Sequence, residues 1–301
     1  MREIIKIGKR IYDTKNRREL HRLVVFAGRS VLHHSGVKEL LQWFQADSVR
    51  AEILKKNAFP IEQATRAFFY AGSTFAERAK LLKEHFALLQ ERMQPEWIKK
   101  IETFHDYEIW RSQEEGLNWR VILAFEPGQR KEGLLSLEMK YGEPEVNLYQ
   151  MMFWLARNKQ GEPSLYIGAM QGPNADHAKE LIKEATKLSF RYRTKNLILY
   201  MTQAVARSLG VQHIYAVSNQ GYYAMNHMRK DRKLKTDFGA FWEEAGGQLT
   251  EDARFYELPL TEARKTMEEV PTRKRAVYRK RFAFLDEVDA EIAEKMRDIL
   301  L

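Results

Sequence analysis

The chain has 301 residues, of which 44% are hydrophobic and 12% aromatic, and this composition excludes global disorder because it supplies enough apolar material for a buried core. The formal net charge of +9 favours acidic partners, namely anionic lipid surfaces, nucleic acid, acidic carrier proteins or phosphorylated ligands, without selecting one of them. The absence of cysteine excludes disulfides, thiolate metal sites and a cysteine nucleophile, and it fits a reducing cytoplasm.

The length corresponds to one large domain or two intimate ones, since a domain has roughly 100–200 residues. Basic residues near the amino terminus are followed by an apolar run at residues 23–28, which is too short for the core of a signal peptide. No stretch approaches the roughly 20 apolar residues that span a bilayer. We therefore expect a cytoplasmic protein without a transmembrane segment, and peripheral contact with the inner membrane stays open.

Residues 1–112 are expected to form a helical amino-terminal region. An amphipathic pattern over residues 38–54 predicts a helix that breaks near Asp47. Thr74 and Glu77 match a capping box, in which each side chain satisfies a backbone donor of the other residue. The clearest helical pattern follows this box, with apolar residues at alternating four- and three-residue steps: Phe75, Ala79, Leu82, Phe86, Leu89 and Met93.

The apolar period changes from helical to two residues after Glu115-Gly116. Alternation within residues 119–125 and 135–141 predicts half-buried strands of an antiparallel meander. Residues 146–156 are apolar on both faces, which indicates a central strand, and a fourth strand is expected from Leu165. The sequence therefore predicts a meander of four strands.

The stretch at residues 164–218 predicts a strand, a turn, two helices and a second strand at residues 211–217. Gly172 and Pro173 mark the turn, because proline has no N–H for a ladder and glycine tolerates unusual backbone angles. Two strands joined by a helical crossover of this size lie most easily side by side and parallel.

The carboxyl-terminal part is expected to add a short helix capped by Asp237, a strand at residues 254–258 and a long helix from about Thr272. The predicted fold class is α+β. A helical amino-terminal part, residues 1–112, packs on a mixed-sheet domain, residues 113–301, and a long helix closes that domain.

Several short motifs occur in one order along most of the chain: LQWFQ at 41–45, GAMQGP at 168–173, KNLIL at 195–199, IYAVS at 214–218, FWEEAGG at 241–247 and KRAVYR at 274–279. In this combination the chain resembles the bacterial VirK/YbjX family. The resemblance implies a role in envelope homeostasis, virulence and tolerance of antimicrobial peptides in Gram-negative bacteria. It supplies no catalytic residues.

The order of a meander, a strand, a helical crossover and a parallel strand is similar to the core of the GNAT-like acyltransferases, which use coenzyme A or an acyl-carrier protein. That likeness implies an acyl donor between two diverging strands, with its phosphates on the first amides of the next helix. Residues 171–176 depart from the usual phosphate turn, because Pro173 removes a donor and Asp176 adds a negative charge. Acyl-carrier protein, acyl-CoA, a lipid ligand and no donor at all therefore stay open.

The residues expected to hold a donor surround the same turn and the end of the next strand: Gln171, Gly172, Asn174, Lys179, Lys183 and Asn219. Lys179, Lys183 and Lys187 recur at four-residue spacing and would form a basic ridge for phosphate, an acidic carrier protein or lipid head groups. The alternative for this ridge is a solvated helix face.

A denser basic cluster, here called the carboxyl-terminal basic cluster, consists of Arg273, Lys274, Arg275, Arg279, Lys280 and Arg281. It suits an anionic membrane surface. Nucleic acid is the weaker expectation, because no helix-turn-helix, zinc-finger or RNA-recognition motif accompanies the charge. Helix capping and local ion pairs to Asp286 and Glu287 are the alternative.

The residues expected to carry chemistry are Ser218, Tyr222 and Tyr223, which follow the strand at 211–217, and His177. Ligands of open α/β sheets commonly bind beyond such strand ends. Tyr222 or Tyr223 can donate a proton to a leaving thiolate, Ser218 or Asn219 can hold a carbonyl oxygen, and His177 is placed for acid–base work. The histidines lack the spacing with carboxylates that zinc requires, so we expect no metal site.

Two functions remain for the whole chain. The first is an envelope protein of the VirK/YbjX type that acts as an acyltransferase-like enzyme with an acyl-carrier donor. The second is a non-catalytic peripheral protein that binds anionic lipid, with nucleic acid as a third choice that rests on charge alone.

Overall fold

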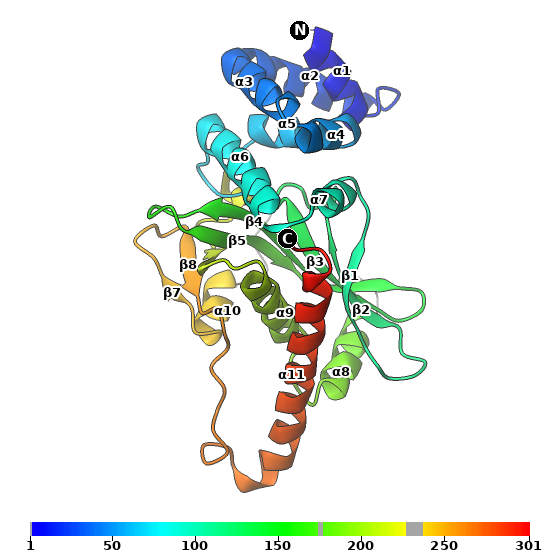
Figure 1. The fold of residues 1–301 in the computed structure, drawn as a ribbon, viewed down its shortest axis with the longest axis vertical. Coiled ribbons are helices and arrows are strands. Elements are labelled where there is room, and N and C mark those ends of the chain that lie inside the picture. Colours follow the sequence, from blue (N-terminus) through cyan, green and yellow to red (C-terminus); the bar gives the residue numbers. More distant parts are fainter. Residues whose placement is uncertain (1, 174–176, 227–236) are drawn as a thin grey trace.

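The computed structural model describes residues 2–173, 177–226 and 237–301. The molecule is elongated, with a group of helices at one end, a sheet in the middle and a long helix that extends toward the other end (Figure 1). The α-helices of the described residues are α1 (Arg2–Ile11), α2 (Arg17–Leu32), α3 (His34–Gln45), α4 (Ser48–Lys56), α5 (Phe59–Thr65), α6 (Phe75–Arg92), α7 (Pro95–Glu102), α8 (Ala178–Leu188), α9 (Thr194–Ser208), α10 (Phe238–Glu244) and α11 (Arg275–Arg297).

The strands of the described residues form one mixed sheet of eight. They are β1 (Tyr107–Arg111), β2 (Trp119–Ala124), β3 (Leu135–Tyr141), β4 (Val146–Arg157), β5 (Pro163–Gln171), β6 (His213–Val217), β7 (Gln248–Leu249) and β8 (Phe255–Leu258). The spatial order is β1-β2-β3-β4-β5-β6-β8-β7, with β5 and β6 as the parallel pair. The predicted α+β class, with a mixed sheet and a long carboxyl-terminal helix, is therefore confirmed.

The sheet begins earlier than the sequence pattern indicates. β1 lies at Tyr107–Arg111, inside the segment expected to be helical, and it pairs antiparallel with β2. A run of five residues is too short to show a two-residue period clearly. The meander therefore has five antiparallel strands instead of four.

The helix boundaries at the amino-terminal end follow the predicted caps. Asp47 separates α3 from α4, and its carboxylate accepts a hydrogen bond from the backbone N–H of Arg50 at 3.0 Å. At the start of α6, the Glu77 carboxylate accepts from the Thr74 backbone N–H at 2.7 Å, and the Thr74 hydroxyl accepts from the Glu77 N–H at 3.2 Å. The predicted capping box is confirmed.

α6 packs along β4 and bonds to its backbone where β3 has ended. The backbone N–H of Leu155 donates to Nδ1 of His85 at 3.1 Å, and that of Arg157 donates to Oε2 of Glu84 at 3.1 Å. Nε2 of His85 lies 3.2 Å from Oε1 of Glu102, and both side chains are fully buried. Burial raises the pKa of Glu102. These contacts of Glu84 and His85 hold the amino-terminal helices against the sheet.

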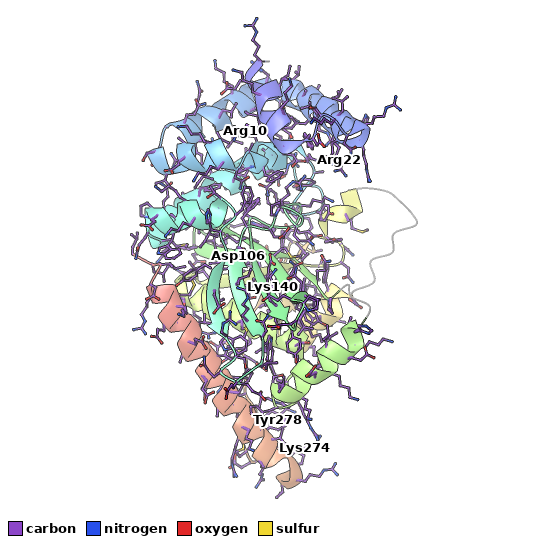
Figure 2. The ribbon with its side chains drawn as sticks, turned by 90° about the vertical axis from the view of Figure 1, so that its right-hand side faces the viewer. Arg10, Arg22, Asp106, Lys140, Lys274 and Tyr278 are labelled. Atoms are coloured by element: carbon purple, nitrogen blue, oxygen red, sulfur yellow. The ribbon has the colours of Figure 1, made fainter. Side chains whose placement is uncertain are left out.

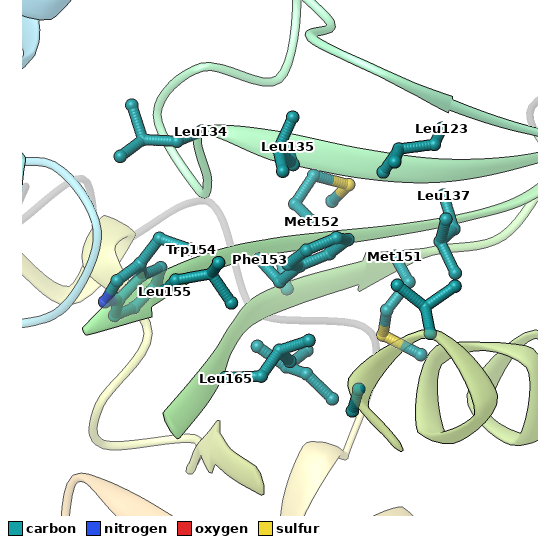
Figure 3. Packing of buried hydrophobic residues seen from close by; sticks show 14 of the residues in the cluster. Leu123, Leu134, Leu135, Leu137, Met151, Met152, Phe153, Trp154, Leu155 and Leu165 are labelled. Atoms are coloured by element: carbon teal, nitrogen blue, oxygen red, sulfur yellow. The ribbon is translucent and has the colours of Figure 1, made fainter. Parts of the chain in front are cut away.

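The core is continuous across both faces of the central strand, β4. Met151, Met152, Phe153, Trp154 and Leu155 are each at most 1% exposed, and their side chains leave the strand toward both sides (Figure 3). The sequence prediction of a central strand apolar on both faces is confirmed, because β3 and β5 flank β4.

The helical crossover connects β5 to β6 through α8 and α9, and the predicted parallel pairing is confirmed from Ser164 with His213 to Ile167 with Ala216. α9 is buried along most of its length and packs against α11, β3 and β4. Gly168 of β5 lies against the loop before β3, where a Cβ atom would come within 1.8 Å of the Glu132 carbonyl oxygen. Only glycine allows the loop to approach so closely.

Candidate functional site

Two of the predicted site residues hold the backbone of the loop after β6. The Ser218 hydroxyl donates to the carbonyl oxygen of Ala253 at 2.7 Å and accepts from the N–H of Gly221 at 3.0 Å. The Asn219 side chain donates to Oδ1 of Asp237 at 2.9 Å and accepts from the N–H of Phe238 at 2.7 Å. Asn219 therefore ties this loop to the start of α10, whose predicted cap at Asp237 is confirmed.

Tyr222 and Tyr223 lie next to each other and are half-buried, with ring centroids 5.0 Å apart. The Tyr222 hydroxyl donates to Oε1 of Glu132 at 2.6 Å. Burial raises the pKa of Tyr222 and also that of Glu132. Tyr222 and Glu132 therefore share a proton where water has little access. The sequence does not reveal Glu132 as a site residue, because it lies ninety residues before Tyr222.

The predicted donor-side residues are divided between the end of β5 and α8. Gln171 is the last residue of β5, and its side-chain carbonyl accepts from Gln129 at 2.7 Å. Gly172 follows it, and a Cβ atom there would meet only the Tyr149 ring at an ordinary distance. His177 is the N-cap residue of α8, is exposed and makes no side-chain cap hydrogen bond. Asn174 lies outside the described residues.

Lys179 and Lys183 are exposed on α8, as is Lys187. Figure 1 shows α8 and α10 apart, on either side of α9 and α11. Because Asn219 is bonded to the start of α10, the structure does not bring these lysines together with the loop after β6.

The parallel pairing of β5 and β6 comprises four residue pairs and stops one residue before β6 ends. Pairing ends at Ile167 with Ala216, whereas β5 continues to Gln171. The carbonyl oxygen of Val217, the last residue of β6, accepts a hydrogen bond from the Trp242 indole at 2.8 Å. The loop that carries Glu132 covers β5 at Gly168.

The carboxyl-terminal basic cluster begins α11, and part of it serves the fold. Arg281 donates to the carbonyl oxygens of Phe190 and Arg191, each at 3.1 Å from Nη2, and its guanidinium lies 4.4 Å from the centre of the Tyr278 ring. Arg275 donates to the carbonyl oxygen of Val270 at 3.0 Å. The other four members, Arg273, Lys274, Arg279 and Lys280, are exposed.

The opposite end of the molecule carries a surface that the sequence interpretation missed. Nine large hydrophobic side chains of the described residues are exposed, and five of them lie in α1 and α2. These five are Ile5, Leu20, Val24, Val31 and Leu32, with exposed fractions of 37%, 44%, 62%, 46% and 81%. Exposed basic residues accompany them: Lys6, Lys9, Arg17 and Arg18. We call these nine residues the α1–α2 surface.

The α1–α2 surface combines an apolar stripe with positive charge. Leu20, Val24 and Val31 recur at steps of four and seven residues, which places them on one side of α2, and Arg17 lies on the same side. Residues 2–32 contain nine Lys or Arg and three Asp or Glu, so they carry +6 of the net charge of +9. Such a surface can insert aliphatic groups below a layer of negative head groups.

The signal for this surface is present in the sequence but ambiguous. α2 buries Leu23 and Phe26 on one side and exposes Leu20 and Val24 on another. Periodicity detects both apolar sides without showing which one meets the core. Among the described residues, no helix combines the length and the apolar character needed to cross a membrane.

Comparisons with known proteins agree with the motif resemblance. The family described as "Protein of unknown function (DUF535)" matches residues 15–294. The uncharacterized protein YbjX of Escherichia coli K12 is 28% identical over 235 residues, which cover 77% of this chain and 70% of that protein. An uncharacterized protein of Haemophilus influenzae is 29% identical over 60% of this chain and 58% of its own length.

A third relative has a name that refers to membranes. The protein named "Membrane protein LapB" of Mannheimia haemolytica is 27% identical over 218 residues, which cover 70% of this chain and 85% of that protein. No solved structure matches the chain. The likeness to GNAT-like acyltransferases therefore depends on the order and pairing of the elements alone.

Proposed function

The chain belongs to the DUF535 family, and on that premise we propose that it is a peripheral membrane protein that binds anionic lipid through the α1–α2 surface. The observation that carries the proposal is the concentration of exposed aliphatic side chains in two helices that also hold most of the net positive charge. The name of the Mannheimia haemolytica relative supports a membrane setting. The inner face of the bacterial inner membrane would then be the site of the envelope role that the VirK/YbjX resemblance implies.

The two components of this surface contribute comparable free energies. A basic side chain near an anionic membrane contributes about 1 kcal/mol. An aliphatic side chain that enters the interface partly contributes about 1 kcal/mol, less than the roughly 1.5–3 kcal/mol of full burial. Neither component alone holds a protein stably on a bilayer, but four cations together with five aliphatic groups do so.

The proposal is tested by sedimentation with vesicles. The protein should co-sediment with vesicles that contain about 30% phosphatidylglycerol at low salt and should remain in solution with pure phosphatidylcholine. Raising the salt to about 0.5 M should weaken binding without abolishing it, because salt screens the cations but leaves the aliphatic contact intact.

Failure to sediment with the anionic vesicles at low salt would overturn the proposal. So would a stable dimer in sedimentation velocity, with Val24 and Leu32 protected from solvent, because a second copy would then cover the same surface.

The hydrogen-bonded pair of Tyr222 and Glu132 beyond the end of β6 favours a second candidate function, acyl transfer from an acyl-carrier protein or acyl-CoA. In this function the Tyr222 hydroxyl would turn from Glu132 to the leaving thiolate and give it the proton. Glu132, whose pKa burial raises, would be protonated and would return a proton to the phenolate oxygen. Ser218 and Asn219 would fix the loop that carries Tyr222, and Tyr223, His177, Gln171, Gly172, Lys179 and Lys183 remain candidates for donor contacts.

Native mass spectrometry of freshly purified protein would detect a bound carrier protein, lipid or nucleotide. If a donor is bound, Tyr222→Phe should reduce its turnover at least about 100-fold, as expected when a general acid is removed. Unchanged turnover would exclude Tyr222 from the reaction.

A further inference from the structure

A cleft of about 540 Å³ opens on the face of the sheet beside α6. Its walls are α6, the turn between β4 and β5, and the hairpin of β7 and β8, and its floor contains Trp154, Tyr166 and Tyr215. The volume lies within the range of small-molecule sites, roughly 300–1,000 Å³. Ser218, Asn219, Tyr222 and Tyr223 do not line the cleft, and neither does the α1–α2 surface.

The three floor rings form a ladder across neighbouring strands. Trp154 pairs in register with Tyr166, and Tyr166 with Tyr215. The centroids are 5.6 Å apart in the first pair and 4.9 Å in the second, and the rings are nearly parallel. The Tyr70 centroid lies 6.3 Å from that of Trp154, and the His213 centroid lies 5.8 Å from that of Tyr215. Each ladder ring therefore has at least one face covered by a neighbouring ring, which leaves a flat aromatic ligand little open surface to stack on.

Most of the charged side chains around the cleft are paired, and among the basic ones Lys159 is exposed and has no ion pair with a described residue. Four basic and five acidic residues line it. The Lys80 ammonium lies 3.6 Å from Oε1 of Glu84, and the Arg254 guanidinium lies 2.7 Å from Oδ2 of Asp252. Arg157 pairs with Glu91 at 2.8 Å. An anionic ligand would have to displace a carboxylate from three of the four cations and would meet only Lys159 directly, so phosphorylated ligands fit the cleft poorly.

The cleft also offers hydrogen-bonding groups that the fold does not use. No described residue lies within hydrogen-bond distance of the Tyr166 hydroxyl, although the side chain is mostly buried. Burial raises the pKa of Tyr166, so this hydroxyl keeps its proton and can donate. At the mouth, the side chains of Gln160 and Gln248 add amide donors and acceptors. The hydroxyl oxygen itself is accessible to solvent, so a ligand in the cleft can replace water as its hydrogen-bond partner.

We propose that this cleft binds an uncharged, hydroxyl-rich molecule, specifically a short oligosaccharide. The hydroxyl groups of such a ligand can exchange hydrogen bonds with the Tyr166 hydroxyl and the Gln160 amide. Because the ligand is uncharged, it leaves the ion pairs of the cleft intact. Its C–H groups contact apolar parts of the wall such as Leu81 and Ala156. The proposal is independent of lipid binding, because the cleft and the α1–α2 surface share no residue.

The proposal is tested by calorimetry with two neutral trisaccharides, maltotriose and tri-N-acetylchitotriose, and with ATP as an anionic, planar counter-probe. At least one trisaccharide should bind the wild-type protein and ATP should not. Tyr166→Phe removes only the hydroxyl and should weaken binding about 3- to 10-fold, the effect of losing one hydrogen bond. Tyr278→Phe, near the start of α11 and outside the cleft, is the matched control and should leave binding unchanged.

Gln160→Ala provides a second variant on an exposed turn, where folding is not at risk. It should also weaken binding of the trisaccharide. The proposal is overturned if neither trisaccharide binds, if ATP binds more tightly than both, or if a bound trisaccharide is insensitive to Tyr166→Phe and Gln160→Ala alike.

Discussion

The two ends of the molecule are both basic, but their cations have different surroundings. Figure 2 labels Arg10 and Arg22 at the helical end and Lys274 and Tyr278 at the start of α11, at opposite ends of the longest axis. At the start of α11, Arg275 and Arg281 donate to backbone carbonyls, and Arg281 also lies over an aromatic ring. At the helical end, exposed cations lie beside exposed aliphatic side chains.

Basic residues at the start of α11 therefore partly stabilise the fold, whereas those at the helical end are available to a partner. A flat membrane cannot contact both ends at once, because they point in opposite directions along the long axis (Figure 1). The carboxyl-terminal basic cluster is denser in sequence, yet it has no exposed large hydrophobic residue beside it among the described residues. The α1–α2 surface has both components that interfacial binding needs.

The largest effect should come from removing charge at the helical end. Replacing Lys6, Arg17 and Arg18 together with Gln should lower binding to anionic vesicles about 100-fold at low salt, because each cation contributes about 1 kcal/mol. The matched control replaces Arg273, Lys274 and Lys280 with Gln and removes the same charge from the opposite end. Equal losses from both triple variants, measured by vesicle sedimentation, would show that net charge alone drives binding.

Removing the aliphatic component should give the next largest effect. Val24→Ser with Leu32→Ser should reduce vesicle binding about 10- to 30-fold, and the loss should persist at high salt, because the aliphatic contribution is not electrostatic. Leu249→Ser changes another exposed aliphatic residue, on β7, with 54% of its surface exposed, and serves as the control. If the double variant binds vesicles as tightly as the wild-type protein does, the α1–α2 surface binds lipid through its charges alone.

The local features of the fold could be predicted, whereas the site depended on long-range pairing. The capping box at Thr74 and the central position of β4 follow from residues close in sequence. By contrast, the Ser218 hydroxyl bonds to Ala253, and Tyr222 bonds to Glu132, which no local pattern reveals. The aromatic ladder likewise depends on the register of three strands, and register is set by the folded sheet.

Arg281 should matter for stability, in contrast to its neighbours in the same cluster. Arg281→Ala should lower the free energy of unfolding by about 1–3 kcal/mol, because the carbonyl oxygens of Phe190 and Arg191 lose their donor. Lys280→Ala, one residue away and exposed, should change it by less than about 0.5 kcal/mol. Urea unfolding measures both. If the two variants behave alike, the start of α11 is a solvated helix face.

The smallest effect concerns how the helical end is held on the sheet. Buried Glu62 of α5 accepts hydrogen bonds from the Tyr12 hydroxyl at 2.5 Å and from Arg130 of the loop between β2 and β3 at 2.7 Å, and it pairs with Arg66 at 3.2 Å. Burial alone would raise the pKa of Glu62, but these donors outweigh it and lower the pKa below 4.5. No comparable buried carboxylate fixes the start of α11 among the described residues.

A carboxyl group with a lowered pKa stabilises the folded state fully above its unfolded pKa and loses this contribution as pH falls toward its folded pKa. The free energy of unfolding should therefore fall below about pH 4.5, with Glu62 contributing at most about 1.4 kcal/mol per pH unit. Glu62→Gln should flatten this dependence, whereas Glu287→Gln, on the exposed side of α11, should not. Urea unfolding at a series of acidic pH values measures the slopes. An unchanged slope in Glu62→Gln would mean that other carboxylates cause the acid dependence. The contacts of Glu62 would then not distinguish the attachment of the amino-terminal helices from that of α11.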